Sequence, residues 1–308
     1  MTPNQYDVPH GDVQRPRSDV DAATVTEAGE RLVLALTSVT PCAPVRDLIG
    51  STDVAAAYLV QEHLNATRTA AGARVVGRKI GATSEAVQTQ LGVDQPDFGV
   101  LFDDMGFPDG ADIPVERLLQ PKVEAEVAFV LSEDLAEGPL DLAQVRGAIA
   151  YAVAAIEIVD SRIQDWDISF ADTVADNASS GLYVLGTQQR TLAEVEPVEV
   201  TMSMSIDGEE VSTGTGAACL GDPLKAVAWL AHQARTFGEP LRAGQVVLSG
   251  ALGPMRAVTP GATVVAEISG LGSVTAHFPT TDRQQAHQQA HQQAHQQAHQ
   301  QAQQKDQS

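Results

Sequence analysis

Two glutamates share one face of a stretch that is otherwise apolar, residues 119–131 (LQPKVEAEVAFVL). Valine and phenylalanine alternating with small residues are typical of a β-strand. In such a strand, Val123 and Phe129 point to one side. Glu124 and Glu126 point together to the other side, about 7 Å apart. Because two like charges are costly when buried, the stretch predicts either a strand with a water-exposed acidic face or a buried site that holds a cation.

A third acid, Glu157, lies in the apolar stretch 152–159 (AVAAIEIV), which also has the composition of a strand. A lone acid among apolar residues rarely stays buried without a partner. Three carboxylates on two neighbouring strands would form a site of hard oxygen ligands, which select magnesium, manganese or calcium, and no Cys or His lies nearby to favour zinc. Asp160 competes as the third ligand. Its side chain is expected to face away from Glu157, so we favour Glu157.

The charge of the chain limits its partners. Acidic residues outnumber basic ones by 40 to 19, a formal net charge of −21, which argues against nucleic acid or an anionic membrane as the main partner. The two cysteines, Cys42 and Cys219, have neither a disulfide framework nor metal-ligand spacing, as expected for a reducing cytoplasm. No apolar run has the length of a membrane span, and the polar N-terminus does not resemble a signal peptide.

Changes in composition divide the chain into parts. Helical patterns dominate the first third, including a helix-start signal that ends at Asp53, and short strands punctuated by Gly and Pro dominate the rest. We therefore expect a small helical front packed on a larger β-rich body. The predicted parts are a disordered leader (1–22), an N-terminal α/β part (23–110), a β-rich catalytic core (111–280) and a low-complexity Gln/His tail (281–308).

The tail carries four copies of Gln-Gln-Ala-His at residues 284–299. Its histidines would share one helical face and could bind a metal, but a solvated low-complexity extension is the simpler interpretation. We therefore exclude the tail from the predicted fold and site.

Two more titratable residues fall in glycine-containing motifs. Lys79 lies in GRKIG at the end of a predicted strand, and Asp97 lies in the loop QPDFG. A solvated lysine and a turn aspartate are the ordinary interpretations. In a cleft beside a metal, the same groups could bind a carboxylate or transfer protons. A polar loop is expected over residues 161–181, with Arg162 and Asp165 in an ordinary ion pair.

Two common catalytic patterns are missing from the sequence. The glycine-rich STGTG at 212–216 lacks the lysine of a P-loop and follows a hairpin signal at 207–208, so nucleotide binding is not expected. Outside the tail, the histidines have no motif around them, so neither a Ser-His-Asp nor a Cys-His arrangement is predicted.

Several long motifs together resemble one family. They are GRKIGATSEAVQTQLGVDQPDFGVLFDDM (77–105), LQPKVEAEVAFVL (119–131), AIEIVDSRIQDW (155–166), DTVADNASSG (172–181) and LSGALGPM (248–255). In this order, they closely resemble the motifs of the 2-keto-4-pentenoate (2-hydroxypenta-2,4-dienoate) hydratases, members of the fumarylacetoacetate-hydrolase-like superfamily. The resemblance covers roughly residues 25–279.

The resemblance implies an α+β fold, in which a small helical N-terminal part packs on a mixed β-roll core of the fumarylacetoacetate-hydrolase C-terminal type. It implies a hydro-lyase that adds water to 2-hydroxypenta-2,4-dienoate (2-oxopent-4-enoate), giving 4-hydroxy-2-oxopentanoate, in the meta-cleavage route for aromatic compounds. It also implies a cytoplasmic homo-oligomer that could form a complex with a related decarboxylase or a downstream aldolase.

The resemblance also assigns roles to particular residues. Mg²⁺ or Mn²⁺ would be bound by Glu124, Glu126 and Glu157. Lys79 and Asp97 match groups that are regarded as catalytic in the family, through substrate binding and proton transfer. The residues expected to line the pocket and contact the substrate are Asn177, Ser179, Ser249 and Gly250.

Related activities are the alternatives. The 4-oxalocrotonate decarboxylases share the metal segment but usually carry an aromatic residue other than phenylalanine in the P-x-Y-G segment, and a different late glycine loop, so PDFG and GALGPM favour a hydratase. The C–C bond hydrolases of the superfamily use a water activated by His and Glu, and no histidine here is placed to supply it. A catalytically silent partner of a decarboxylase is a further alternative, but such a partner has no need for a costly acid cluster.

Overall fold

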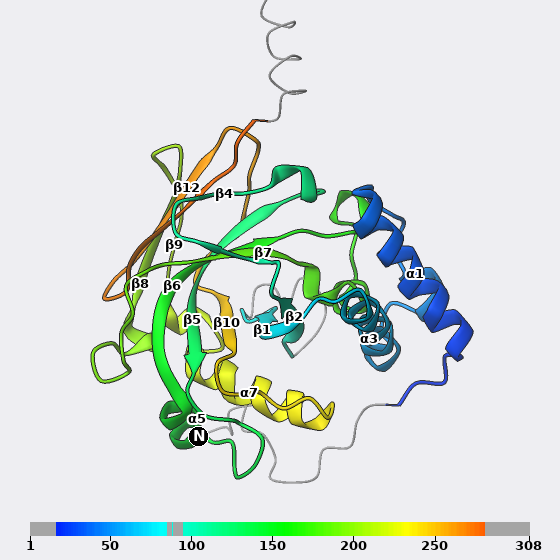
Figure 1. The fold of residues 1–308 in the computed structure, drawn as a ribbon, viewed down its shortest axis with the longest axis horizontal. Coiled ribbons are helices and arrows are strands. Elements are labelled where there is room, and N and C mark those ends of the chain that lie inside the picture. The colour runs from blue at the N-terminus through cyan, green and yellow to red at the C-terminus, as the bar shows by residue number, and fades with distance from the viewer. Residues whose placement is uncertain (1–16, 85–87, 89–94, 281–308) are drawn as a thin grey trace, which may run out of the picture.

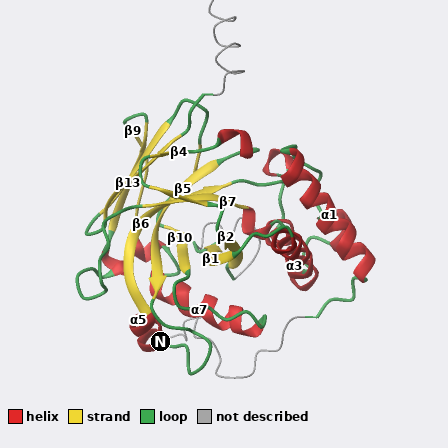
Figure 2. Cartoon of the chain, viewed as in Figure 1, coloured by secondary structure: helices red, strands yellow, loops and turns green. Residues whose placement is uncertain are grey.

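The computed structural model describes residues 17–84, 88 and 95–280. Two β-sheets and a few helices make up these residues (Figures 1 and 2). The first 16 residues of the predicted leader and the Gln/His tail lie outside the described residues. The helices are α1 (Ala22–Ser38), α2 (Arg46–Ile49), α3 (Val54–Ala70), α5 (Leu142–Ala148), α6 (Phe170–Ala175) and α7 (Pro223–Thr236). Among them, none has the length and apolar character of a membrane span.

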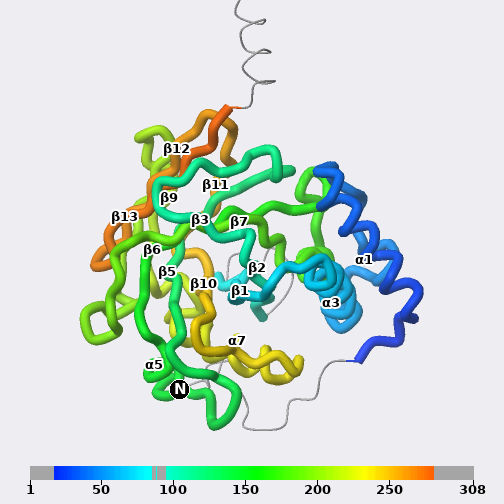
Figure 3. Tube along the Cα trace, viewed as in Figure 1, coloured from blue at the N-terminus to red at the C-terminus, as the bar shows by residue number. Residues whose placement is uncertain are grey.

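The larger sheet has eight strands in the described residues and is mixed parallel and antiparallel. Its strands, in spatial order, are β2 (Asp97–Phe102), β1 (Val75–Gly81), β10 (Val246–Ala251), β5 (Lys122–Leu131), β6 (Ile149–Val159), β7 (Ser180–Leu185) and β3 (Gly106–Pro108). The short β11 (Arg256–Ala257) pairs with β5 off this path and is labelled in Figure 3.

The smaller sheet has five strands in the described residues and packs against β6 and β7. Its order is β4 (Ala111–Asp112), β13 (Gly272–His277), β12 (Thr263–Ile268), β8 (Thr201–Ile206) and β9 (Glu209–Thr215). The predicted hairpin at Asp207-Gly208 joins β8 to β9. In Figure 1, this sheet and the pair α1–α3 lie on opposite sides of the central strands. The structure confirms the expected α+β fold, a small helical front on a mixed β core.

The helical front is tied to the larger sheet through α3. Asp53 accepts a hydrogen bond from the Ala56 N–H at 2.9 Å and so caps α3, as its start signal predicts. Further along α3, the Gln61 side chain donates to the carbonyls of Phe98 at 2.9 Å and Val174 at 2.8 Å. One amide therefore joins α3, β2 and α6, which holds the front against the free edge of β2.

The larger sheet crosses the predicted boundary at residue 110. β1 pairs antiparallel with β2 and parallel with β10, so strands from both sides of that boundary form one sheet. The pairing brings Lys79 of β1 opposite Leu248 of β10. The division of the chain into parts at this residue stays a prediction.

β5 confirms the predicted alternation of side chains. Val123, Val127 and Phe129 are fully buried on one of its faces. Glu126, on the opposite face, is fully buried as well, and Glu124 is partly buried. A strand with a water-exposed acidic face is therefore the wrong interpretation of this stretch. The two glutamates face the interior of the protein.

The segment 161–181 is not the polar loop that its composition predicts. It contains α6 and the tight turn η3 (Asn177–Ser179), and most of its residues from 170 onward are buried. Its two buried acids, Asp172 and Asp176, bind backbone groups in the interior. The Asp172 carboxylate, fully buried, accepts hydrogen bonds from the N–H groups of Val45 and Arg46, each at 2.9 Å. Polar composition predicts exposure only where such partners are missing.

The predicted ion pair of Arg162 with Asp165 is wrong. The partner of Arg162 is the buried Asp176, and the guanidinium also donates to the carbonyls of Asp160 at 2.8 Å and Ser180 at 2.6 Å. Arg162 is itself buried, and its planar set of donors satisfies the Asp176 carboxylate and three carbonyls together, the third being the Asp176 carbonyl. Asp165 was predicted because it is close to Arg162 along the chain. A buried arginine instead pairs with a carboxylate that is buried beside it, which here is Asp176.

Asp172→Asn should lower the free energy of unfolding by about 3 kcal/mol. The amide NH₂ of asparagine would face N–H groups that now donate hydrogen bonds to the buried carboxylate. Urea-induced unfolding measures this loss. Asp167→Asn is the matched control, because Asp167 pairs with the same Arg46 but its side chain is 66% exposed. Its expected loss is below about 1 kcal/mol. Equal losses in the two variants would contradict the role given to Asp172.

Candidate metal centre and active site

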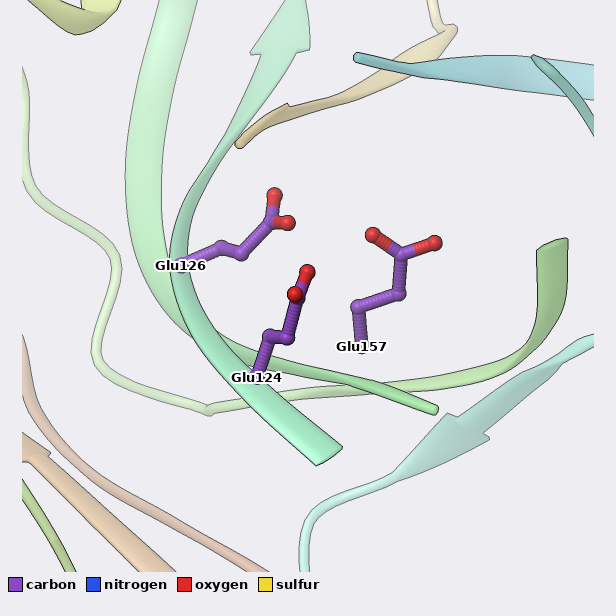
Figure 4. Close-up of side chains that lie close together, drawn as sticks. All are labelled: Glu124, Glu126 and Glu157. Carbon is purple, nitrogen blue, oxygen red and sulfur yellow. The ribbon is translucent and has the colours of Figure 1, made fainter. Parts of the chain in front are cut away.

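Three carboxylates from two neighbouring strands meet in the larger sheet. In the antiparallel pairing of β5 with β6, Glu124 lies directly opposite Glu157, and Glu126 follows two residues along β5 on the same face. One carboxylate oxygen from each of the three residues lies within 4.8 Å of the others. Figure 4 shows the three side chains pointing toward one another. The adjacency of the two strands, which the site requires, is therefore present.

Asp160, the competing third ligand, has a different role. Its carboxylate accepts hydrogen bonds from the N–H groups of Leu119 at 2.9 Å and Gln120 at 2.6 Å. It therefore holds the chain just before β5, which begins at Lys122. Asp160 is not part of the three-carboxylate cluster, and the geometry agrees with the preference for Glu157.

The cluster has oxygens that no group in the described residues satisfies. Glu126 Oε1 and Glu157 Oε2 are buried and have no partner there, and Glu157 Oε1 has no hydrogen bond but lies 3.2 Å from the Lys79 ammonium. Buried polar atoms are nearly always hydrogen-bonded, and a charged one left alone is costly. A divalent cation would satisfy all three side chains, and a set of carboxylate oxygens fits Mg²⁺ or Mn²⁺. The residues present therefore fit the metal that the family resemblance implies.

The electrostatics of the cluster also favour a cation. Burial and the neighbouring charge of Glu157, against the opposing effect of Lys79, together raise the pKa of Glu124 to about 7. Burial, together with the charges of Glu157 and Glu124, raises the pKa of Glu126 well above its ordinary value. Without a cation, the cluster therefore retains protons at neutral pH, because three like charges cannot all be kept in a buried site.

A β-bulge in β10 brings a backbone donor to the cluster. The register of β10 against β5 shifts between Leu248 and Ala251, which frees the Gly250 N–H to donate to Glu126 Oε2 at 2.8 Å. Gly250 has a φ of +111°, and a Cβ added there would lie 2.4 Å from the Thr83 side chain. Only glycine fits at this position. Gly250 therefore orients a predicted metal ligand through its backbone.

Ser249, the neighbour of Gly250, braces the same strand. Its hydroxyl donates to the Val127 carbonyl at 2.8 Å, and the Cys219 thiol donates to the Ser249 carbonyl at 2.8 Å. Ser249 is fully buried, so its hydroxyl joins β10 to β5. The predicted contact of Ser249 and Gly250 with a substrate stays a prediction.

Lys79 lies beside the carboxylate cluster, and its side chain is buried. Its Nζ is 3.2 Å from Glu157 Oε1 and donates a hydrogen bond to the Ala178 carbonyl at 3.0 Å. Burial lowers the pKa of Lys79, but the surrounding carboxylates, Glu157 first, more than offset this and raise the pKa overall. Lys79 therefore stays a cation, and the interpretation of a solvated lysine at a strand end is wrong.

Asp97 faces Lys79 from the neighbouring strand. It is the first residue of β2, opposite Gly81 of β1, and is 2% exposed, so it is not an exposed turn residue. A Cβ added to Gly81 would lie 2.2 Å from Asp97 Oδ1 and 3.2 Å from Lys79 Nζ, so the two groups face one point. Burial raises the pKa of Asp97, partly offset by Lys79. Burial therefore favours the protonated form of Asp97 more than it would for an exposed aspartate.

Asn177 and Ser179 lie in the turn η3, which packs on β2. The Asn177 side chain accepts from the Val100 N–H at 2.8 Å and donates to the Val100 carbonyl at 2.9 Å, and the Ser179 hydroxyl is 3.3 Å from that of Thr173. Residues 177, 178 and 179 all have left-handed φ angles, of 53°, 52° and 52°. Outside glycine, each such residue costs about 1–2 kcal/mol. The predicted substrate contacts of Asn177 and Ser179 stay predictions.

Two contributors to the site were missed at the level of sequence. The Ala178 carbonyl that binds Lys79 leaves no trace in side-chain chemistry, because every residue type carries the same carbonyl. Gly81 makes room for Asp97 beside Lys79, and the second glycine of GRKIG was the available signal. Close approach of two charged groups is a common reason for a glycine in a strand.

Known proteins share much of this sequence. The model of the fumarylacetoacetate (FAA) hydrolase C-terminal family matches residues 68–278. A 2-keto-4-pentenoate hydratase of Burkholderia vietnamiensis is 54% identical over 258 residues, which are 84% of this chain and 98% of the relative. The "TodF product hydratase" of Pseudomonas putida is 53% identical over 264 residues, 85% of this chain and 98% of the relative.

A solved structure is similar over its whole length. The 4-oxalocrotonate decarboxylase from Pseudomonas putida G7, complexed with magnesium and adipate, superposes with a TM-score of 0.81 at 34% identity and covers 85% of this chain and 100% of its own. A mixed-sheet fold with a buried carboxylate cluster, matched in sequence over most of its length, defines the class. The chain belongs to the fumarylacetoacetate hydrolase C-terminal family.

Gly250→Ala should weaken Mn²⁺ binding by at least about tenfold, because the added methyl group strikes Thr83 and displaces the N–H that orients Glu126. Isothermal titration calorimetry with Mn²⁺ measures the change. Gly147→Ala is the control, because a Cβ added to Gly147 meets nothing within 4 Å. An unchanged Kd in a folded Gly250→Ala protein would contradict the orienting role.

Mn²⁺ binding should release protons and should strengthen as pH rises toward and past about 7, because the pKa of Glu124 is about 7 and metal ligands must be deprotonated. In the metal-free protein, the folded state binds more protons than the unfolded state between pH 4.5 and about 7, so its stability falls as pH rises through this window. Calorimetry in buffers of different ionisation enthalpy counts the protons. No proton release below pH 7 would contradict the prediction.

Proposed function

We propose that this chain is a metal-dependent hydratase, which adds water to 2-hydroxypenta-2,4-dienoate to give 4-hydroxy-2-oxopentanoate in the meta-cleavage catabolism of aromatic compounds. The observation that carries the proposal is the three-carboxylate cluster with Lys79 and Asp97 beside it. It occurs in a chain whose 52–54% identical relatives include several named 2-keto-4-pentenoate hydratase. The proposed reaction is that of these relatives.

Glu124, Glu126 and Glu157 would hold the cation, Mg²⁺ or Mn²⁺, because their clustered carboxylate oxygens fit either ion. When bound, the cation supplies Lewis-acid stabilisation of the negative charge that develops on the oxygen at carbon 2 of the substrate. The choice between the two metals is part of the proposal. The related decarboxylase structure contains magnesium, which supports a divalent cation of this kind.

Asp97 would move the proton. In its protonated form, which burial favours by raising the pKa of this residue, Asp97 would donate a proton to carbon 5 of the dienol, while the 2-hydroxyl gives up its own proton. The product of this step is the conjugated 2-oxo-3-enoate. Water then adds at carbon 4, and its proton returns to the Asp97 carboxylate. Carbon 3 takes up one proton, which balances the proton that the 2-hydroxyl released in the first step. The sum is one dienoate and one water converted to one product.

Lys79 would bind and orient the substrate. Its ammonium stays charged next to the carboxylates, so it attracts the anionic substrate and favours negative charge near carbon 1 or 2. The remaining predictions for the pocket concern Asn177, Ser179, Ser249 and Gly250, as substrate contacts, and they rest on the resemblance of their loops to those of the family.

The assembly is also proposed. We expect a cytoplasmic homo-oligomer, which could form a complex with a related decarboxylase or a downstream aldolase that consumes the product. Free thiols at Cys42 and Cys219 support a reducing compartment. The second candidate function is 4-oxalocrotonate decarboxylation, favoured by the 34% identical decarboxylase structure. A silent partner of such a decarboxylase is the third.

Incubation with 2-hydroxypenta-2,4-dienoate and Mg²⁺ should yield 4-hydroxy-2-oxopentanoate, followed by loss of dienoate absorbance and by NMR of the product. EDTA treatment, Glu124→Gln and Glu126→Gln should each lower turnover by at least about 100-fold, because Lewis-acid stabilisation is worth several kcal/mol. Glu133→Gln, at an exposed position just beyond β5, is the matched control and should leave turnover unchanged.

The same protein is incubated with 4-oxalocrotonate in parallel. Release of CO₂ without hydration of the dienoate would make the chain a decarboxylase. Absence of both activities in metal-loaded protein would favour the silent partner. Full hydratase activity after complete removal of metal would overturn the role of the cluster.

A further inference from the structure

We infer that Asn177 is a positioning residue, which acts on Lys79 through the carbonyl of Ala178. The inference rests on the proposed function, because Lys79 is taken to serve the hydratase reaction. Asn177 is 3% exposed, and its side-chain amide forms two hydrogen bonds with the backbone of Val100 in β2 and accepts a third, at 3.2 Å, from the Asn65 side chain. Its proposed effect on the site therefore passes through the turn that it begins and takes the place of a side-chain contact with the substrate.

The side chain of Asn177 closes the free edge of a strand. β2 is the outermost strand of the larger sheet and pairs only with β1 among the described strands. The Val100 N–H and carbonyl point away from β1 and are both bound by the Asn177 amide, at 2.8 and 2.9 Å. The amide takes the place of a neighbouring strand at this residue. This two-point contact sets the distance between β2 and the turn.

The turn lies directly on β2 at Gly99. A Cβ added to Gly99 would lie 2.3 Å from the Asn177 carbonyl oxygen, so the turn can be this close only over a glycine. Asn177 also adopts a left-handed φ of 53°, a conformation that asparagine tolerates better than other residues with a side chain. One residue therefore supplies both the backbone conformation that starts the turn and the clamp that holds it down.

The consequence reaches Lys79, which lies opposite Gly99 in the pairing of β1 with β2. The left-handed turn directs the Ala178 carbonyl to Lys79 Nζ at 3.0 Å, while Glu157 Oε1 lies 3.2 Å from the same nitrogen. The carbonyl holds the ammonium against the pull of the carboxylates. Without it, the ammonium would move toward the acid cluster and away from the substrate that it is proposed to orient.

Asn177→Ala should lower kcat by at least about tenfold with KM changed by less than about threefold, because displacing a catalytic group by about 1 Å costs far more in rate than in binding. Asn177→Gly should restore part of the lost kcat relative to alanine, because glycine adopts the left-handed conformation freely. A variant that merely loosened the fold would gain nothing from the more flexible residue.

Gln61→Ala is the matched control. Gln61 also binds the outer edge of β2, through the Phe98 carbonyl, and its other side-chain hydrogen bond goes to Val174 in α6 rather than to the turn. It should lower Tm while kcat stays within about twofold of the original protein. If Gln61→Ala and Asn177→Ala lower kcat equally, the loss comes from a less stable edge of β2 and the inference fails. It also fails if Asn177→Ala keeps its kcat.

A second readout is independent of activity. Lys79 is 3% exposed, and peptide mapping by mass spectrometry measures how fast an amine-reactive reagent modifies it in folded protein. Asn177→Ala should raise this rate at least about threefold, with Lys225 as the internal standard, and Gln61→Ala should not. If the protein has no hydratase activity but the modification rates of Lys79 still differ in this way, the proposed function is refuted and the positioning role of Asn177 stands. Equal rates in all three proteins would overturn the inference.

Discussion

Mutual repulsion of three buried carboxylates is the constraint on which the rest of the site depends. Their oxygens lie within 4.8 Å of one another, where like charges destabilise each other strongly in a medium of low dielectric constant. The surrounding structure offsets part of this charge, through the Lys79 ammonium beside Glu157 and the Gly250 N–H on Glu126. Glu126 Oε1 and Glu157 Oε2 remain without a partner in the described residues, and these are oxygens that a divalent cation would bind.

The buried acids of this chain fall into two groups that differ in one physical respect. Asp160 and Asp172 bind backbone N–H groups, and Asp176 binds Arg162, so the charge of each is satisfied within the fold. The carboxylates of Glu126 and Glu157 keep unsatisfied oxygens. Burial alone therefore does not mark a functional acid. The distinction is whether the protein itself supplies the partners, because a structural carboxylate is stabilised by its own hydrogen bonds and a ligand waits for a cation.

Much of the site could be predicted because the relevant rules are local. The two-residue period of a strand placed Glu124 and Glu126 on one face and turned Glu157 away from its apolar neighbours. The motifs around Lys79 and Asp97 identified both residues, although their ordinary solvated interpretations were open until burial was known. The errors arose where local rules do not apply. Composition predicted a polar loop at 161–181, and proximity along the chain predicted Asp165 as the partner of Arg162. Both predictions were wrong because tertiary contacts bury Asp172 and Asp176, and Asp176 pairs with Arg162.

The sequence by itself determined which side chains share a face and which residues begin helices, because these follow from the periods of strands and helices and from local capping. It also carried the motifs that place the chain in its family. Only the tertiary structure decided that β5 and β6 are neighbours in the register that sets Glu124 against Glu157. It alone placed the Ala178 carbonyl on Lys79 and the Gly250 N–H on Glu126. Such contacts join residues far apart in the chain through backbone atoms that are alike in every residue, so no side-chain pattern encodes them.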